Sequence, residues 1–392
     1  MQQGTIMALA VAMAVFATPL FLDLAVCIVG NLRRAPGPHA AQRRTIRLAV
    51  VVPAHDEETM IARTVRSLKA ADAATQIYVV AHNCSDATGT VAEKAGAVVV
   101  DLKNPKLRGK GAALRHGFAA ALEAGANAFL VIDADSVVSS NLIAATRARL
   151  EEGAAVTQCR YELELPGVGS GRPMTRLRAL AFRGMNVLRA RGRAGLGFST
   201  GLFGNGFALT AATLERAPFS ANSIAEDVEY HTKLACKGVR VFWVGEAFVH
   251  AHMAASGRAQ ATQEGRWEGG RFKVGSQATG HLMAAVLQGR WRAVETLADV
   301  WSLPLSRGIL ALMLMAALPL HWLHVFAGVC AGIALIYVLE AALLGTQPMR
   351  DLASLTAAPL YLVWKVAITP IVLLQSRSRA EWARTKREAP QP

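Results

Sequence analysis

The sequence predicts an α/β fold with a doubly wound sheet, and three observations carry this prediction. Short apolar runs alternate with segments of helical periodicity, at the spacing of βαβ units. Polar residues follow directly after these runs, where open sheets of this kind bind ligands. The two ends of the chain are more apolar than its middle, so membrane segments should flank the fold. The expected strands of the first half are residues 48–53, 77–81, 98–100 and 128–132.

Composition narrows the class of protein. The 392 residues are enough for one large domain or two modest ones, and the mean hydropathy is +0.29 with 53% apolar residues. The net charge of +14 favours an anionic membrane surface and a phosphorylated substrate. Basic and aromatic residues do not interleave as in RNA-binding chains, which argues against nucleic acid. The five cysteines are scattered without a C-x-x-C pair, which argues against a zinc site or a disulfide framework.

The chain begins with a long apolar segment. Residues 5–30 are long enough to cross a bilayer, and Asp23 is their only charge. Several arginines follow at once, so the positive-inside rule predicts that the rest of the chain enters the cytoplasm. A cleaved signal peptide is the alternative, although no basic residue precedes the apolar run. We therefore expect a transmembrane helix within residues 1–34, followed by a linker over 35–46.

Two carboxylates follow the fourth expected strand. In a strand, alternate side chains share a face, so the carboxylates of Asp133 and Asp135 should point toward the same ligand. Adjacent carboxylates repel each other unless a cation or a proton lies between them. Oxygen ligands of this kind suit Mg²⁺ or Mn²⁺ holding a diphosphate, and Asp135 is the expected metal ligand. An Asx-rich turn without a metal is the alternative.

Other polar residues belong to the same predicted edge of the sheet. Pro53, His55 and Glu57 stand at the end of the first strand, and Asp86 follows the second. Lys110 lies between two glycines at the start of a helix, where backbone N–H groups also attract anions. An ordinary solvated lysine is the alternative at that position. These residues are expected to form a nucleotide site.

The second half of the polar region is less regular. We expect strands over 155–163 and 239–244, a basic helix over 176–193, and a Gly-rich segment over 195–206 that contains Gly204 and Asn205. Glu226 and Asp227 lie at a helix start, where simple helix capping is the alternative to a catalytic role. The amphipathic stretch 263–291 is expected on the membrane surface.

Three apolar segments close the chain, over 303–320, 324–344 and 352–374. The basic tail within 377–392 should be cytoplasmic, which requires an even number of crossings after the catalytic domain. We therefore expect one of the three segments to be re-entrant or interfacial. Pro319 interrupts the first segment, and the last segment carries Lys365 and Pro370, so either of these two could be the segment that does not cross.

With these motifs in order, the sequence resembles the membrane-bound inverting glycosyltransferases of family 2, which include cellulose, chitin and hyaluronan synthases. The resemblance covers about residues 48–271. It rests on the first-strand end from Pro53 to Glu57, on a DxD motif at Asp133 and Asp135, on an ED motif at Glu226 and Asp227, and on a Q-x-x-R-W motif. Gln263, Arg266 and Trp267 form this last motif.

The resemblance implies a GT-A-type mixed sheet over 47–255, a Q-x-x-R-W and interfacial segment over 256–300, and membrane segments over 301–376. It implies that Glu57 and Asp86 contact the uridine of a UDP-sugar, that Lys110 and Asp133 hold the nucleotide, and that Asp227 is the general base beside Glu226. Gln263, Arg266, Trp267, Gly204 and Asn205 are then expected to bind the acceptor or the diphosphate.

These features predict a metal-dependent, inverting glycosyltransferase in the inner (cytoplasmic) membrane. We expect it to transfer glucose or N-acetylglucosamine from a UDP-sugar to a lipid-linked saccharide in exopolysaccharide or envelope glycan assembly, where partner proteins of such a system would act beside it. Glu264 replaces the second basic residue usual after the Gln, and the membrane part is short for a polymer channel, which disfavours a processive synthase. That synthase remains the alternative, and a non-catalytic membrane scaffold is a rival of another class.

Overall fold

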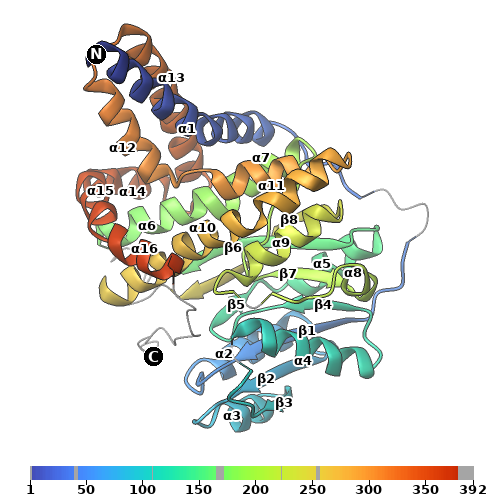
Figure 1. The fold of residues 1–392 in the computed structure, drawn as a ribbon. Coiled ribbons are helices and arrows are strands. Elements are labelled where there is room, and N and C mark those ends of the chain that lie inside the picture. The colour runs from blue at the N-terminus through green and yellow to red at the C-terminus, as the bar shows by residue number, and fades with distance from the viewer. Residues whose placement is uncertain are drawn as a thin grey trace.

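An eight-stranded mixed sheet forms the centre of the computed structural model, with helices on both faces (Figure 1). The described residues are 2–38, 43–107, 109–164, 172–221, 223–252 and 257–377. The strand order is β3-β2-β1-β4-β7-β6-β8-β5, in which β1 to β4 are parallel and β7 and β5 are antiparallel to their neighbours. The strands are β1 Leu48–Ala54, β2 Ile77–His82, β3 Val98–Leu102, β4 Ala128–Val131, β5 Ser136–Val138, β6 Val156–Glu164, β7 Phe207–Thr210 and β8 Val241–His252.

The sheet is covered on both faces, as expected of a doubly wound fold. Helices α2 (Ile61–Ala71), α3 (Thr88–Lys94) and α5 (Leu142–Glu151) share one apolar core with the sheet. Helices α4 (Lys110–Glu123) and α9 (Glu226–Cys236) bury their apolar side chains in a second core on the other face. The short helix α8 (Ala211–Arg216) follows β7. Since β1, β2 and β4 are buried on both faces, their sequences are continuous apolar runs.

The four strands expected in the first half are confirmed within one or two residues, and the helix starting at Lys110 is also confirmed. One local expectation is wrong: β4 ends at Val131, so Asp133 and Asp135 lie in the turn between β4 and β5 and not on a strand. Strands β5 and β7 were not expected, and β8 extends to His252, well beyond residue 244.

The expected basic helix is a continuous helical segment with a π-helical turn in its middle. It comprises α6 (Pro173–Arg183), η1 (Gly184–Leu188) and α7 (Arg189–Gly195). Five of its arginines are buried: Arg176, Arg178, Arg183, Arg189 and Arg193. The segment therefore forms a charged layer inside the protein, between the sheet and the apolar helices (Figure 1).

Two of these arginines join the first helix, α1 (Gln2–Asn31), to the rest of the chain. Arg193 donates hydrogen bonds of 2.9 and 2.7 Å to one carboxylate oxygen of Asp23, and Arg189 binds the other. Arg189 and Arg271 also bind Asp299. We call these five residues the Asp23–Asp299 cluster. It ties a predicted membrane segment to the catalytic region.

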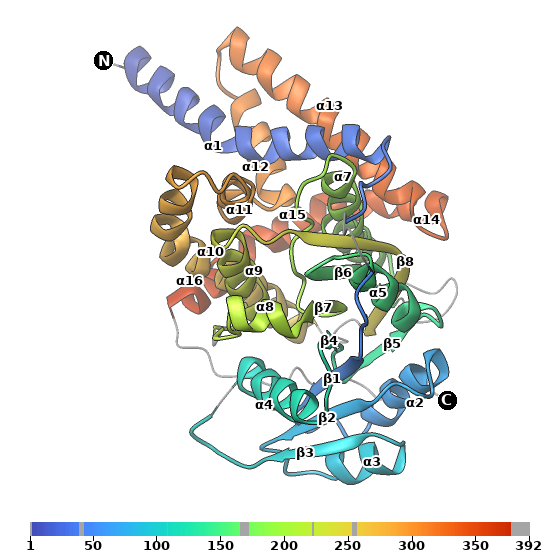
Figure 2. The ribbon, with the colours of Figure 1, turned by 90° about the vertical axis from the view of Figure 1, so that its right-hand side faces the viewer.

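The apolar helices lie at the end of the molecule opposite β3 (Figures 1 and 2). Two of them are long and apolar enough to cross a membrane, namely residues Gly4–Asn31 of α1 and α13 (His321–Leu343). Helices α11 (Arg292–Trp301) and α12 (Leu305–Ala316) pass the same test only as a pair, bent by 66°. The third apolar segment is divided into α14 (Pro348–Ala353), η2 (Ser354–Ala357), α15 (Ala358–Ala367) and α16 (Thr369–Arg377). The tail over 378–392 and linker residues 39–42 lie outside the described residues.

Candidate active site

Lys110 lies at the centre of the candidate site, at the first residue of α4. Its ammonium nitrogen is 2.6 Å from a carboxylate oxygen of Asp133 and 3.4 Å from one of Glu226. It also donates a 2.5 Å hydrogen bond to the carbonyl of Gly204. Burial alone would lower the pKa of Lys110, but the carboxylates of Asp133 and Glu226 hold that pKa above its ordinary value. The lysine therefore stays charged and draws together three distant segments of the chain.

The turn after β4 is held by two buried amides. The backbone N–H of Asp133 donates to Oδ1 of Asn205 at 3.1 Å, and Nδ2 of Asn205 donates to the Ser136 hydroxyl at 2.9 Å. Gln158 of β6 donates to the Asn205 carbonyl at 2.7 Å. Asn205 is completely buried and positions the turn, so its direct contact with an acceptor or a diphosphate stays a prediction.

Asp133 and Asp135 share a neighbour, although they are not on a strand. Asp135 is 4% exposed, and one of its oxygens accepts a 3.4 Å hydrogen bond from the Ser136 hydroxyl. Burial raises the pKa of Tyr161 on β6, and the negative charges of Asp133 and Asp135 raise it further. Tyr161 therefore lies near enough to both acids to feel their charge, on the strand next to the candidate site.

Glu226 and Asp227 are the first two residues of α9. A Cβ atom placed on Gly204 would be 3.4 Å from Oδ2 of Asp227 and 3.6 Å from Nζ of Lys110, so Asp227 lies beside the lysine. Burial and the neighbouring Glu226 carboxylate raise the pKa of Asp227 to about 7, while Lys110 lowers it. A carboxylate that titrates near neutral pH is suited to accept a proton from a hydroxyl group. Helix capping alone does not account for these contacts.

The turns after β1 and β2 carry the remaining predicted nucleotide residues. These strands are parallel neighbours, with Pro53 opposite Val80, so both turns lie at one edge of the sheet. Nδ1 of His55 is 2.8 Å from the His82 carbonyl, and the Glu57 N–H donates to the Thr88 hydroxyl at 2.7 Å. Asp86 accepts hydrogen bonds from the N–H groups of Glu58 and Thr88, at 3.1 and 2.9 Å. Its carboxylate thus supports the start of α3, and its contact with uridine stays a prediction.

The same turns bring together three side chains of metal-binding type. Ligand atoms of His55, Asp56 and Cys84 lie within 4.8 Å of one another. The Asp56 carboxylate also accepts from the N–H and the hydroxyl of Ser85, at 2.7 and 3.2 Å. Sequence spacing gave no sign of this cluster, because its members come from two strands that pair only in the fold.

The Q-x-x-R-W motif lies near the start of α10 (Gly257–Leu287). Trp267 is 41% exposed, and its ring lies 5.8 Å from that of Phe182, centroid to centroid. Phe182 in turn meets Tyr161 edge to face at 5.0 Å. One turn beyond Trp267, a Cβ on Gly270 would be 2.9 Å from the side chain of Ala225, directly before Glu226. Helix α10 is therefore packed against the start of α9, while Gln263 and Arg266 are partly buried on the same helix.

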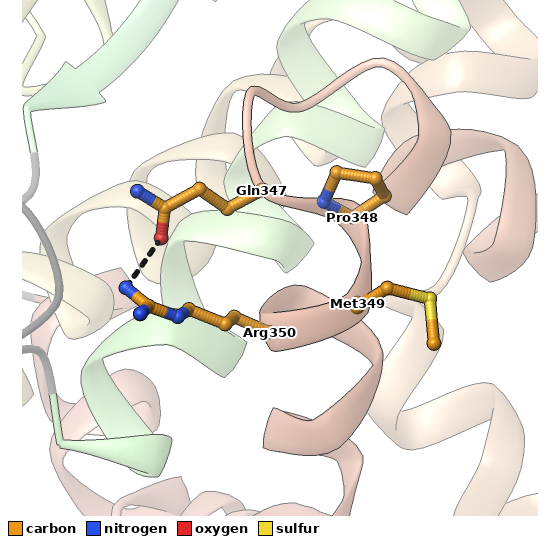
Figure 3. Close-up of a pocket in the computed structure, with 4 residues that line it drawn as sticks. All are labelled: Gln347, Pro348, Met349 and Arg350. Carbon is orange, nitrogen blue, oxygen red and sulfur yellow. Dashed lines mark hydrogen bonds between the residues drawn. The ribbon is translucent and has the colours of Figure 1, made fainter.

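A surface pocket of about 410 Å³ lies elsewhere, where α13 leads into α14 (Figure 3). Its lining residues are Gln347, Pro348, Met349 and Arg350, and Arg350 donates a 3.2 Å hydrogen bond to Gln347. None of these four is a predicted site residue. The pocket therefore lies at the connection between α13 and α14 and is not part of the candidate site.

The structure thus gathers Lys110, Asp133, Gly204, Glu226 and Asp227 into one cluster, with Asp135 in the same turn as Asp133. Three contributors were missed from the sequence: Gln158, Tyr161 and Phe182. They belong to no motif, and their roles arise only because β6 pairs between β7 and β8 and α6 crosses beside α10.

A mixed α/β sheet with carboxylates beyond its strand ends is suited to bind a nucleotide and a divalent metal. Residues 46–270 match the family described as Glycosyltransferase like family 2, and since this is more than half of the chain, the protein belongs to that family. It is a glycosyltransferase that uses a nucleotide-sugar donor.

Two known proteins illustrate this relationship. Protein RfbJ of Shigella flexneri is 31% identical over 97 residues, which cover 25% of this chain and 70% of that protein. The mannosyltransferase PcManGT of Pyrobaculum calidifontis, solved with GDP-Man and Mn²⁺, superposes with a TM-score of 0.53 at 17% identity. That likeness covers 95% of this chain and 97% of the mannosyltransferase, so the similarity of fold extends over nearly the whole length of both chains.

Proposed function

We propose that this glycosyltransferase moves glucose or N-acetylglucosamine from a UDP-sugar, with inversion, to a lipid-linked saccharide at the inner membrane. The product would enter exopolysaccharide or envelope glycan assembly. The proposal is carried by the cluster of Lys110 with Asp133, Glu226 and Asp227. In this cluster the Lys110 ammonium group lies close to Asp227, a carboxylate with a raised pKa. The apolar helices at one end of the molecule support a membrane-bound acceptor (Figure 2).

The residues suit an inverting displacement. Asp227 would remove the proton from the acceptor hydroxyl as that oxygen bonds to the anomeric carbon of the donor sugar. Lys110, already fixed on the Gly204 carbonyl, would offer its charge to the departing diphosphate together with Arg266. Trp267 would present its exposed face to an acceptor ring. Because the transfer is a single displacement, an α-linked donor would give a β-linked product.

The residues of the β4–β5 turn fit a divalent metal. Asp133 and Asp135 offer hard carboxylate oxygens, the ligands preferred by Mg²⁺ and Mn²⁺, and Asp135 is nearly buried beside Tyr161. A metal held there would neutralise charge on the diphosphate leaving group. Mn²⁺ accompanies GDP-Man in the solved mannosyltransferase, which supports metal use and brings GDP-mannose into consideration as a second donor.

The two apolar helices and the arginines after α1 support the proposed localisation in the inner membrane, with the catalytic region in the cytoplasm. If the bent α11–α12 pair crosses together with α13, two crossings follow the catalytic region. The divided segment over 352–374 would then be the interfacial one. Labelling of single cysteines introduced in the first turn of α1 and after α13, in a variant without the five native cysteines, would test this topology in intact cells.

A panel of radiolabelled nucleotide sugars, including UDP-glucose, UDP-N-acetylglucosamine and GDP-mannose, tests the function. Membranes with the unaltered protein should yield label in a lipid-extractable product, and membranes with Asp227→Asn should yield none. Polymeric product would favour a processive synthase, and normal glycan assembly with Asp227→Asn would favour a scaffold. Trp267→Ala should impair acceptor use more than hydrolysis of the donor, and equal loss of both would contradict stacking.

A further inference from the structure

One buried arginine beside the Q-x-x-R-W helix lacks partners for two of its nitrogen atoms. The side chain of Arg178 on α6 is 5% exposed, and among the described residues neither its Nε nor its Nη1 has a hydrogen-bond partner. Its Nη2 is 3.7 Å from an oxygen of Glu264, and its guanidinium carbon lies 5.4 Å from the ring centroid of Trp364. Buried charged donors without acceptors cost free energy, so this group requires an explanation.

The charges around Arg178 do not balance. Lys365 binds Glu264 at 2.5 Å and Glu268 at 2.8 Å, and Arg307 binds Glu268 at 2.8 Å. Together with Arg178, these residues form a cluster of three cations and two carboxylates around α10, so that among the described residues one positive charge is in excess. Uncompensated charge in a partly buried cluster is unfavourable, and an anion of one negative charge would compensate it.

The position of Arg178 points to the acceptor as the source of that anion. Phe182 follows Arg178 by four residues on α6, and Trp267 follows Glu264 by three on α10, so each pair lies on one helix face. The rings of Tyr161, Phe182 and Trp267 are in successive contact, at 5.0 and 5.8 Å, and β6, which carries Tyr161, pairs with β7 next to β4, the strand before Asp133 and Asp135. Arg178 is therefore one helical turn from a row of rings that starts at the reaction centre.

We propose that Arg178 binds the phosphate of a glycosyl-phosphate acceptor, while the acceptor sugar lies against Phe182 and Trp267. The inference rests on the proposed function and names the chemistry of its acceptor. A guanidinium group suits this role because its N–H donors form charge-assisted hydrogen bonds with phosphate oxygens. The phosphate supplies acceptors for Nε and Nη1 and removes the excess charge of the cluster.

Binding and transfer should be measured with acceptors that carry the same sugar on three different groups. These are an uncharged octyl glycoside, a soluble glycosyl phosphate, and a polyprenyl glycosyl phosphate in vesicles. The full chain in detergent or vesicles is used, with tryptophan fluorescence for binding and labelled donor for transfer. Preference for the polyprenyl form over the soluble form would identify a lipid headgroup as the source of the phosphate.

Arg178→Gln is the test variant, and Arg176→Gln is its matched control. Arg176 is an equally buried arginine of the same helix, but its donors are bound to Asp351 and Gln347. Arg178→Gln should weaken binding of the phosphorylated acceptors at least roughly tenfold more than binding of the octyl glycoside. Arg176→Gln should affect both kinds of acceptor equally, and Arg178→Lys should restore part of the preference because it keeps the charge.

Equal losses for charged and uncharged acceptors in Arg178→Gln would overturn the inference. If that variant does not fold, the unaltered protein still decides: it should bind the glycosyl phosphate more tightly than the octyl glycoside, and inorganic phosphate should reduce this difference. A lack of preference would overturn the inference. Binding with this preference but without transfer from any donor would instead count against the proposed function alone.

Discussion

The assignment of Asp227 as general base predicts the pH at which transfer declines. Burial and the charge of Glu226 raise the pKa of Asp227 to about 7, and only the ionised carboxylate can accept a proton. One pH unit below this value, about one tenth of the enzyme would hold an ionised base. At pH 6, kcat/KM should therefore be about tenfold below its plateau at alkaline pH.

Glu226→Gln tests the cause of this raised pKa. Glutamine has nearly the same size but no charge, so the repulsion that disfavours an ionised Asp227 would be lost. Lys110, whose ammonium nitrogen is 3.4 Å from Glu226, would then have fewer carboxylate partners, and its charge would stabilise ionised Asp227 more strongly. Both effects lower the pKa of Asp227, and the acidic limb of the profile should move down by about one pH unit.

Glu229→Gln is the matched control, since Glu229 lies on the same first turn of α9 but accepts a 3.0 Å hydrogen bond from the Ser223 N–H. Its profile should coincide with that of the unaltered enzyme. The assay is the initial rate of labelled transfer at low substrate concentration, on both sides of neutral pH. A profile that is flat through neutrality, or a limb that Glu226→Gln moves upward, would refute the reasoning.

Four further outcomes are expected. Gly204→Ala should reduce kcat and cost about 1 kcal/mol of stability, since residue 204 has a φ of +76° and a new Cβ would lie 3.4 Å from Asp227. Gly280→Ala is its control, because a Cβ there meets nothing within 4 Å. Asp135→Ala should weaken nucleotide binding only when Mn²⁺ is present, as calorimetry with and without the metal would show. Asp299→Asn removes a carboxylate from the Asp23–Asp299 cluster, so unfolding in detergent should reveal a loss of about 3–5 kcal/mol. Because the pKa of Asp227 is raised in the folded protein, its protonated form stabilises the fold at acidic pH, and this stability is lost as pH rises through about 7. The unfolding temperature of Asp227→Asn should therefore change less between pH 5 and pH 8 than that of the unaltered protein.

The sequence predicted the first half of the sheet well because its strands are buried on both faces and appear as uninterrupted apolar runs. The same reasoning misplaced Asp133 and Asp135, since an apolar run continues to Ile132 although strand pairing stops at Val131. Periodicity describes burial, whereas the end of a strand is decided by its neighbours in the sheet.

The positions of candidate site residues were predictable where a residue type and its local position agree, as for Lys110 at a helix start and Asp227 in a first turn. Contacts between distant elements were not predictable. The bond of Lys110 to the Gly204 carbonyl and the burial of Arg178 depend on how α4, β7 and α10 are arranged. A basic segment with the composition of a solvated helix proved to be an interior layer, because its acidic partners come from other parts of the chain.

The pairing of Asp23 with Arg189 and Arg193 has a consequence for biosynthesis and for preparation of the protein. If α1 crosses the membrane as proposed, it enters the bilayer before either arginine has been synthesised, and its Asp23 carboxylate stays unpaired until then. A fragment cut after α1, in the hope of a soluble enzyme, would leave both arginines without that counter-ion. Through Asp23, α1 is thus a part of the folded enzyme in addition to its proposed role as a membrane anchor.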